Sequence, residues 1–148
     1  MTNKKLIESD KAPDFSAPDQ SGKIRSLSEF YGKWLLLYFY PKDFTAGCTV
    51  EAEKFRDNFE KLKSLVTILG ASADDVSSHS RFCQKYNLPF DLISDSEEKV
   101  IKSYGADGII FARRCSFLID PKGIIRKIYD KVDPKAHAQQ IIQDLERL

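Results

Sequence analysis

The distribution of apolar residues along the chain predicts alternating strands and helices. Residues 34–40 form a continuous apolar and aromatic run followed by a proline, and residues 66–72 form a second apolar run. Runs of this length are typical of strands buried on both faces of a partly parallel sheet. Between them, Phe55, Phe59 and Leu62 recur at helical spacing among charged residues, which gives one apolar stripe on a helix. We therefore expect a strand, a helix and a strand in the first half of the chain.

The second half of the chain continues this alternation and then changes to a hairpin. A helix is predicted over residues 75–86, with Asp74 or Asp75 as candidate N-cap and with Asn87 and Pro89 near its end. The remaining predicted elements are a strand at 91–93, a helix at 96–104, strands at 116–119 and 124–129 joined by a turn at 120–123, and a helix from residue 134. This order predicts one α/β domain over residues 1–148, with a mixed central sheet flanked by helices. Residues 1–11 are a candidate flexible N-terminal segment.

Composition and charge narrow the functional classes. The 148 residues include 23 Lys or Arg and 22 Asp or Glu, for a net charge of +1, and the charges are spread along the chain. Because no basic block is present, we expect neither nucleic acid nor a membrane surface as a partner. The N-terminus lacks the apolar stretch of a signal peptide, and no apolar run is long enough to cross a bilayer. We expect a cytoplasmic protein, since its three cysteines are too few for a secreted disulfide framework.

Cys48 is the residue whose local sequence most clearly indicates chemistry. It follows a turn rich in Pro and Gly at the end of the first predicted strand, where a helix begins. In open α/β sheets, ligands bind at this edge. If Thr45 is the N-cap, its hydroxyl can accept a hydrogen bond from the Cys48 N–H, and the thiol lies in the first helical turn. The unpaired N–H groups and the helix dipole there favour thiolate over thiol, so we expect an oxidisable nucleophile.

Four segments of the sequence carry a family resemblance. They are APDF from Ala12, GKWLLLYFYPKDFTAGCTVEAEKFRD from residue 32, KYNLPFDLISD from residue 85, and RRCSFLIDPKG from residue 113. The most specific feature is the spacing of Pro41, Thr45 and Cys48 combined with the distant Arg114. The chain thereby resembles the peroxiredoxins of the AhpC/TSA superfamily, in the bacterioferritin comigratory protein or Q-type branch, over nearly its whole length. This resemblance implies a thioredoxin-like fold with an N-terminal β-hairpin extension. It also implies reduction of hydrogen peroxide and organic hydroperoxides by Cys48 as peroxidatic cysteine, without a cofactor.

The chemistry of peroxide reduction explains the residue types in this pattern. A thiolate attacks one peroxide oxygen in line, and negative charge builds on the leaving oxygen. Candidate donors to that charge are the backbone N–H groups of Gly47 and Cys48, the Thr45 hydroxyl and the Arg114 guanidinium. Gly47 would let peroxide approach the backbone, and Pro41 would shield the thiolate and fix the loop. The alternatives are that Pro41 only ends the strand and that Arg114 is a surface residue.

Glu51 lies one helical turn beyond Cys48 and raises a difficulty. A carboxylate without a partner at that position would oppose the thiolate. The simplest resolution, which the resemblance also suggests, is that Glu51 pairs with an arginine and orients it. The alternative is an ordinary solvated charge on the helix.

The oxidised Cys48 must be reduced again, and two other cysteines are available. Many members of the branch carry a resolving cysteine in the same helix, but Glu53 occupies that position here. Another subset has it where Cys83 stands, so the resemblance implies a Cys48–Cys83 disulfide. This bridge would require local unwinding, because thiols in two folded helices rarely meet disulfide geometry. Otherwise Cys83 is a small core residue. Strand alternation turns Cys115 away from Arg114, which favours core packing.

The remaining expectations concern partners and alternatives. The resemblance implies thioredoxin or a similar dithiol as reductant, and a monomer. His79 and His137 are expected on helix surfaces, and their spacing predicts no metal site. Four alternatives stay open: a one-cysteine peroxidase reduced by an external thiol, a thioredoxin-type thiol-disulfide oxidoreductase, a redox sensor and a holdase. The absence of a second cysteine three residues after Cys48 counts against the oxidoreductase.

Overall fold

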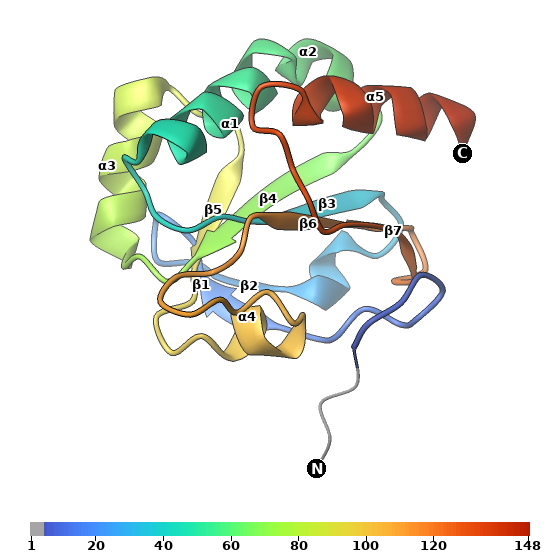
Figure 1. The fold of residues 1–148 in the computed structure, drawn as a ribbon, viewed down its shortest axis with the longest axis horizontal. Coiled ribbons are helices and arrows are strands. Elements are labelled where there is room, and N and C mark those ends of the chain that lie inside the picture. Colours follow the sequence, from blue (N-terminus) through green and yellow to red (C-terminus); the bar gives the residue numbers. More distant parts are fainter. Residues whose placement is uncertain (1–4) are drawn as a thin grey trace.

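The computed structural model describes residues 5–148, and in it helices cover both faces of a central sheet (Figure 1). In chain order the elements are β1 (Ser16–Pro18), β2 (Ile24–Ser26), the 3-10 helix η1 (Leu27–Phe30), β3 (Leu35–Phe39), α1 (Ala46–Asp57), α2 (Phe59–Leu62), β4 (Thr67–Ser72), α3 (Val76–Tyr86), β5 (Asp91–Ser94), α4 (Lys99–Ser103), β6 (Cys115–Ile119), β7 (Ile125–Tyr129) and α5 (His137–Arg147).

The central sheet has five strands in the order β5-β4-β3-β6-β7. β3 pairs in parallel with β4, and β4 pairs in parallel with β5. β6 is antiparallel to β3, and β7 is antiparallel to β6. The short strands β1 and β2 form a separate antiparallel hairpin. The mixed sheet and the N-terminal hairpin predicted from the sequence are therefore confirmed.

β3 is apolar throughout because it is buried on both faces. Its alternate residues point to opposite sides, as the pleat of a strand requires. Leu35, Leu37 and Phe39 join a core with α4 and the N-terminal segment, whereas Leu36 and Tyr38 join a core with α1, α3 and α5. Figure 1 shows α1, α2 and α5 over one face of the sheet, with α4 and the hairpin on the other. A continuous apolar run is thus what this position in the sheet demands.

Three predicted helices differ from the structure at their boundaries. The helix expected from residue 134 begins at His137, after a turn at residues 134–136. The apolar stripe over residues 55–62 is divided between α1 and α2, because Asn58 leaves helical geometry between them. The helix expected from residue 96 begins only at Lys99, because Glu98 adopts a left-handed φ of 60°. The Asp95 carboxylate accepts hydrogen bonds from the N–H groups of Val100 and Ile101, at 3.2 and 2.7 Å. The chain therefore turns before α4, and Asp95 satisfies N–H groups of its first turn.

The N-terminal segment is described only from residue 5. The predicted flexible segment falls partly on residues 1–4, which lie outside the described residues. Beyond them, the Ser9 N–H donates to the Ile125 carbonyl at 2.8 Å, and the Ile125 N–H donates to the Asp10 carbonyl at 2.9 Å. This part of the segment is thus bound to the start of β7. Among residues 5–148, none of the helices has the length and apolar character that crossing a membrane requires.

Candidate active site around Cys48

Cys48 lies in the first turn of α1, just after the loop that leaves β3. Its side chain is only 2% exposed and packs in the core beneath α1 and α5. The first N–H groups of a helix have no partner within the helix, and the positive end of the helix dipole lies there. The structure therefore places the Cys48 sulfur in the first turn of α1, where the sequence predicts it.

Thr45 is the N-cap of α1, but its hydroxyl does not make the predicted bond. The carbonyl of Thr45 accepts from the Thr49 N–H at 2.9 Å, as a cap residue's carbonyl does. Its hydroxyl donates to the Lys42 carbonyl at 2.7 Å, and the side chain makes no cap hydrogen bond to the helix. The prediction that it accepts from the Cys48 N–H is therefore wrong. The hydroxyl instead fixes the loop before the helix.

Arg114 links the two charged groups of the site. It directly precedes β6, and its Nη2 donates to Cys48 Sγ at 3.3 Å. Its Nη1 donates to Glu51 Oε1 at 2.7 Å, so the arginine partner expected for Glu51 is Arg114. Burial alone lowers the pKa of Arg114, but the negative charges of Glu51 and Cys48 outweigh burial and raise that pKa. The guanidinium is thus held as a cation beside the sulfur.

Glu51 is the most unusual acid of the site because it is almost completely buried. Burial raises its pKa to about 7, although the charge and hydrogen bond of Arg114 partly oppose that shift. Its second oxygen, Oε2, is buried and has no hydrogen-bond partner among the described residues, and the same is true of the Tyr38 hydroxyl. Burial raises the pKa of Tyr38, as do the nearby charges of Glu51 and Cys48. Tyr38 is therefore a polar neighbour of the site. The sequence pattern did not indicate this, because Tyr38 lies within the apolar run of residues 34–40.

Gly47 lies directly against the Arg114 guanidinium. A Cβ atom at Gly47 would lie 2.9 Å from Nη2 of Arg114, closer than such atoms normally approach. A side chain there would require the guanidinium to move, so Gly47 leaves the space in which Arg114 reaches Cys48. Pro41 is half-buried where β3 gives way to the loop. Its role as a shield of the thiolate stays a prediction.

Cys83 lies in α3 as a half-buried free thiol and packs against the same core as Cys48. Burial raises its pKa to about 12, and the charges of Asp43, Asp91 and Asp19 add to this effect. In this conformation Cys83 is a neutral thiol and therefore a poor nucleophile. Its role as the resolving cysteine stays a prediction, and that role requires α3 to open.

Cys115 is completely buried on the other face of the sheet, in the core that also contains Phe39 and Phe117. Burial raises its pKa to about 12, although the positive charge of Arg113 opposes the shift. Core packing of Cys115 is therefore confirmed. The strand pleat separates it from its sequence neighbour Arg114.

Both histidines are buried, so the prediction of surface positions is wrong. His79 is 0% and His137 is 1% exposed, because each lies on the inner face of its helix. Burial lowers the pKa of His137, and a hydrogen bond to Gln140 partly offsets this shift. The sequence held a signal for His79, since it stands at helical spacing with the buried Phe82.

His79 also belongs to a polar cluster that sequence reasoning missed. Ligand-type atoms of Asp43, Asp74 and His79 lie within 4.8 Å of one another, as a metal site would need. The carboxylate oxygens of this cluster already accept hydrogen bonds from Tyr40, Ser78 and the Asp43 N–H. The cluster is therefore a hydrogen-bonded network, and it joins the loop before Cys48 to α3.

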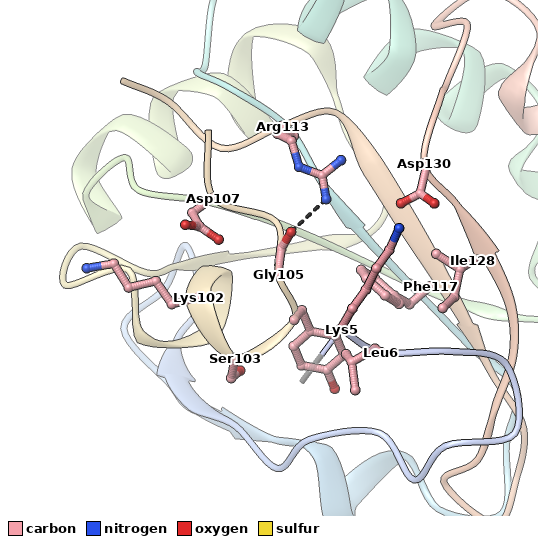
Figure 2. Close-up of a pocket in the computed structure, with 11 residues that line it drawn as sticks. Lys5, Leu6, Lys102, Ser103, Gly105, Asp107, Arg113, Phe117, Ile128 and Asp130 are labelled. Atoms are coloured by element: carbon pink, nitrogen blue, oxygen red, sulfur yellow. Dashed lines mark hydrogen bonds between the residues drawn. The ribbon is translucent and has the colours of Figure 1, made fainter. Parts of the chain in front are cut away.

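A pocket of about 470 Å³ lies apart from Cys48, beside α4, β6 and β7. Figure 2 shows Arg113 at its rim, donating to the Gly105 carbonyl, and Phe117 and Ile128 in its wall. Phe117 belongs to the core on the face of the sheet opposite Cys48. No residue predicted for the site lines this pocket.

Comparison with known proteins shows the family to which the chain belongs. Residues 9–128 match the model of the AhpC/TSA family, and the chain belongs to that family. Within it, the relatives are peroxiredoxin Q and bacterioferritin comigratory proteins. The chain is 43% identical over 141 residues to a putative peroxiredoxin bcp from Coxiella burnetii, covering 89% of this chain and 93% of the relative. It is 41% identical over 141 residues to chloroplastic peroxiredoxin Q from Triticum aestivum, covering 92% of this chain but only 65% of that protein.

Solved structures of the same branch share the fold. A mutant of PrxQ from Xylella fastidiosa superposes with a TM-score of 0.92 at 28% identity, covering 97% of this chain and 98% of that one. The bacterioferritin comigratory protein of Xanthomonas campestris, whose structure was studied for alkyl peroxide reduction, gives a TM-score of 0.85 at 29% identity, with 90% of each chain covered. The thioredoxin-like fold predicted from the sequence is confirmed.

Proposed function

We propose that the protein is a thiol-dependent peroxidase that reduces hydrogen peroxide and organic hydroperoxides at Cys48. The observation that carries this proposal is the donation from Arg114 Nη2 to Cys48 Sγ, at 3.3 Å. A cation at this distance stabilises the thiolate that a peroxide requires as nucleophile. The family membership and the bacterial relative named as a peroxiredoxin support the same activity.

The first step oxidises Cys48 to a sulfenic acid. The thiolate attacks the OH oxygen of the peroxide, the O–O bond breaks, and the sulfur takes that oxygen together with its hydrogen as S–OH. The other oxygen leaves as an alkoxide or hydroxide and takes a proton to become alcohol or water. Arg114 faces the sulfur and is therefore a donor to the charge that develops on these oxygens. The backbone N–H groups of the first turn of α1 are further donors.

The second step restores the thiolate through Cys83. The Cys83 thiol, once deprotonated and exposed, attacks the sulfenic sulfur, and the hydroxyl leaves with a proton as water. The resulting Cys48–Cys83 disulfide is then reduced by two electrons from a dithiol protein of the thioredoxin type. If Cys83 does not act, an external thiol must reduce the sulfenic acid directly.

The expected setting of this chemistry is a reducing one. We infer a cytoplasmic location, because three free cysteines suit a reducing compartment, and a monomer, because the chain resembles the Q-type branch. Plant relatives carry the name chloroplastic, so fractionation of the source cells is the check on location.

The proposal is tested by peroxide consumption with two matched cysteine variants. Cys48→Ser should abolish turnover with hydrogen peroxide while keeping the circular dichroism of the folded protein, because a serine hydroxyl is not ionised near neutral pH. Cys115→Ala should keep the rate of Cys48 oxidation, since that thiol lies in the opposite core. Retained turnover in Cys48→Ser would end the assignment of Cys48 as the nucleophile.

A further inference from the structure

A buried hydrogen-bond network joins the loop before Cys48 to α3. The Asp43 carboxylate accepts from the Tyr40 hydroxyl through Oδ1 at 2.6 Å and from the Ser78 hydroxyl through Oδ2 at 2.8 Å. Oδ2 also lies 2.7 Å from His79 Nδ1, and His79 Nε2 lies 2.9 Å from the Ile93 carbonyl oxygen. Asp43 and His79 are both buried, at 3% and 0% exposure. These four contacts connect the end of the β3 segment, the Cys48 loop, α3 and β5.

The partners of His79 determine where its protons lie. A backbone carbonyl can only accept a hydrogen bond, so Nε2 of His79 carries a proton. The contact between Nδ1 and Asp43 also needs a proton. The Tyr40 and Ser78 hydroxyls both donate to the Asp43 carboxylate, so its oxygens act as acceptors in this network. Both ring nitrogens of His79 therefore face acceptor atoms, Asp43 Oδ2 on one side and the Ile93 carbonyl oxygen on the other.

The loop before Cys48 makes further contacts through Asp43 and Phe44. The Asp43 N–H donates to Asp74 Oδ2 at 2.9 Å, which holds the loop to the segment after β4. The next residue, Phe44, adopts a left-handed φ of 66°, which is costly for a bulky side chain. Its ring packs 5.1 Å from the ring of Phe82 in α3. The Cys48 loop thus contains a strained residue, Phe44. It contacts α3 at two points, through the Asp43 carboxylate and through the Phe44 ring.

We propose that His79, as an imidazolium, pairs with the Asp43 carboxylate in a latch that limits how readily the Cys48 turn and the C-terminal half of α3 open. This inference rests on the proposed function, because the opening is what would bring Cys83 to Cys48. His79 stands in the first part of α3, and Cys83 lies beyond it along the helix. With the latch closed, the loop keeps Cys48 beside Arg114. When α3 opens beyond the latch, Cys83 loses the burial that keeps it neutral.

The ionisable groups facing the imidazole come from several elements. They are Tyr40 at the end of β3, Asp43 in the loop after it, and Asp74 after β4. From β5 only a backbone carbonyl faces the ring. The two acids both stabilise the cation. His137 offers a control, because its partners are the uncharged Ser116 hydroxyl and Gln140 side chain.

The first test reads the protonation of the histidines directly. The chain has two histidines, so ¹⁵N spectra of labelled protein near neutral pH resolve both rings. We expect His79 with both nitrogens protonated and His137 as a neutral ring with one bare nitrogen. In Asp43→Asn, His79 should become neutral while His137 does not change. A neutral His79 in the wild-type protein would overturn the latch.

The second test measures the opening without any peroxide. In His79→Gln, amide hydrogen exchange of α3 and of the first turn of α1 should accelerate by about tenfold or more, the scale of one lost charge-assisted hydrogen bond. His137→Gln should leave exchange in α3 unchanged. Ser78→Ala, which removes only one donor to Asp43, should give a smaller effect of the same sign and remains usable if His79→Gln fails to fold. Exchange in α3 that is unchanged in both latch variants would overturn the proposal.

The third test separates the latch from the proposed function. Stopped-flow oxidation by hydrogen peroxide followed by quenching and mass spectrometry gives the rates of sulfenic acid and disulfide formation. In His79→Gln the disulfide step should become about tenfold faster, while Cys48 oxidation slows by less than about threefold, because only the opened fraction grows. A general structural defect would slow both steps, and a disulfide step that does not accelerate would overturn the latch. If the wild-type protein forms no disulfide, the resolving role of Cys83 fails, and the spectra and exchange still decide the latch.

Discussion

Cys48 and Cys115 are both buried, yet their surroundings differ in charge: a guanidinium contacts the Cys48 sulfur, and apolar side chains surround Cys115. Cys48 is 2% and Cys115 is 0% exposed. A guanidinium lies 3.3 Å from the sulfur of Cys48, whereas Cys115 is packed among the apolar residues of the opposite core. Burial without a charged partner keeps a thiol neutral and inert, and it raises the pKa of Cys115 to about 12. Burial alone therefore says little about the reactivity of a cysteine.

The difference arises from how β6 begins. Arg114 and Cys115 are sequence neighbours, and the alternation of side chains at the start of the strand sends them to opposite faces of the sheet. Arg114 reaches α1, where Gly47 leaves space for the guanidinium. Cys115 faces Phe39 and Phe117 instead. A shift of one residue in the register of β6 would exchange the two environments.

Removing the guanidinium should have the largest effect, because it makes the surroundings of Cys48 more like those of Cys115. We expect Arg114→Ala to slow oxidation of Cys48 by about 10² to 10³, the scale of one lost donor to a developing anion. Stopped-flow measurement with hydrogen peroxide gives this rate. Arg113→Ala is the matched control, because that guanidinium donates to the Gly105 carbonyl. Equal rates in the two variants would remove Arg114 from the site.

Cys83 extends the comparison to a thiol that is only half-buried. We expect Cys83→Ser to oxidise at Cys48 as fast as the wild-type protein, since Cys83 does not contact peroxide in the first step. Its turnover with thioredoxin should fall, and excess peroxide should drive Cys48 on to the sulfinic acid. The measurements are thioredoxin-coupled and glutathione-coupled assays with mass spectrometry of the oxidised proteins. Equal turnover with thioredoxin, and no Cys48–Cys83 disulfide in the wild-type protein, would make Cys83 a core residue.

A smaller effect concerns Glu51 and appears in the pH dependence of stability. Burial raises the pKa of Glu51 from an ordinary value of 4.5 to about 7, so the folded state holds a proton that the unfolded state has released. The contribution of this proton to stability is fully present below pH 4.5 and is lost as the pH rises through about 7. The Tm of Glu51→Gln should therefore rise relative to the Tm of the wild-type protein as the pH increases from 4.5 to about 7. A difference in Tm that does not change with pH would contradict the raised pKa.

Much of the fold was predictable because its signals are local. The buried runs of β3 and β4, the Asp75 cap of α3 and the turn that begins at Asp120 each depend on nearby residues. Asp75 accepts from the Ser78 N–H at 2.8 Å, as an N-cap should. The position of Arg114 beside Cys48 is not local, and it was expected through the family resemblance rather than through periodicity.

The errors in prediction concern polar groups that had several possible partners. The Thr45 hydroxyl could bond forward to the helix or back to the loop, and it bonds back to the Lys42 carbonyl. The expectation of a surface position for His79 is wrong, because its spacing to Phe82 places it on the buried stripe of α3. Its partner Asp43 lies far away in sequence. No local pattern could pair them, since the contact forms only when β3 and β4 pair in parallel and bring the loop and α3 together.

The central claim is that Cys48, among the three buried or half-buried thiols, is the one that reacts with peroxide. The most direct measurement adds one equivalent of hydrogen peroxide to the reduced protein, traps sulfenic acid with a selective reagent and maps the labelled peptide by mass spectrometry. We predict that Cys83→Ser carries the label on Cys48 with Cys115 unmodified, and that Arg114→Ala carries much less label at the same time point. Label on Cys115 in place of Cys48, or equal label on both, would contradict the account.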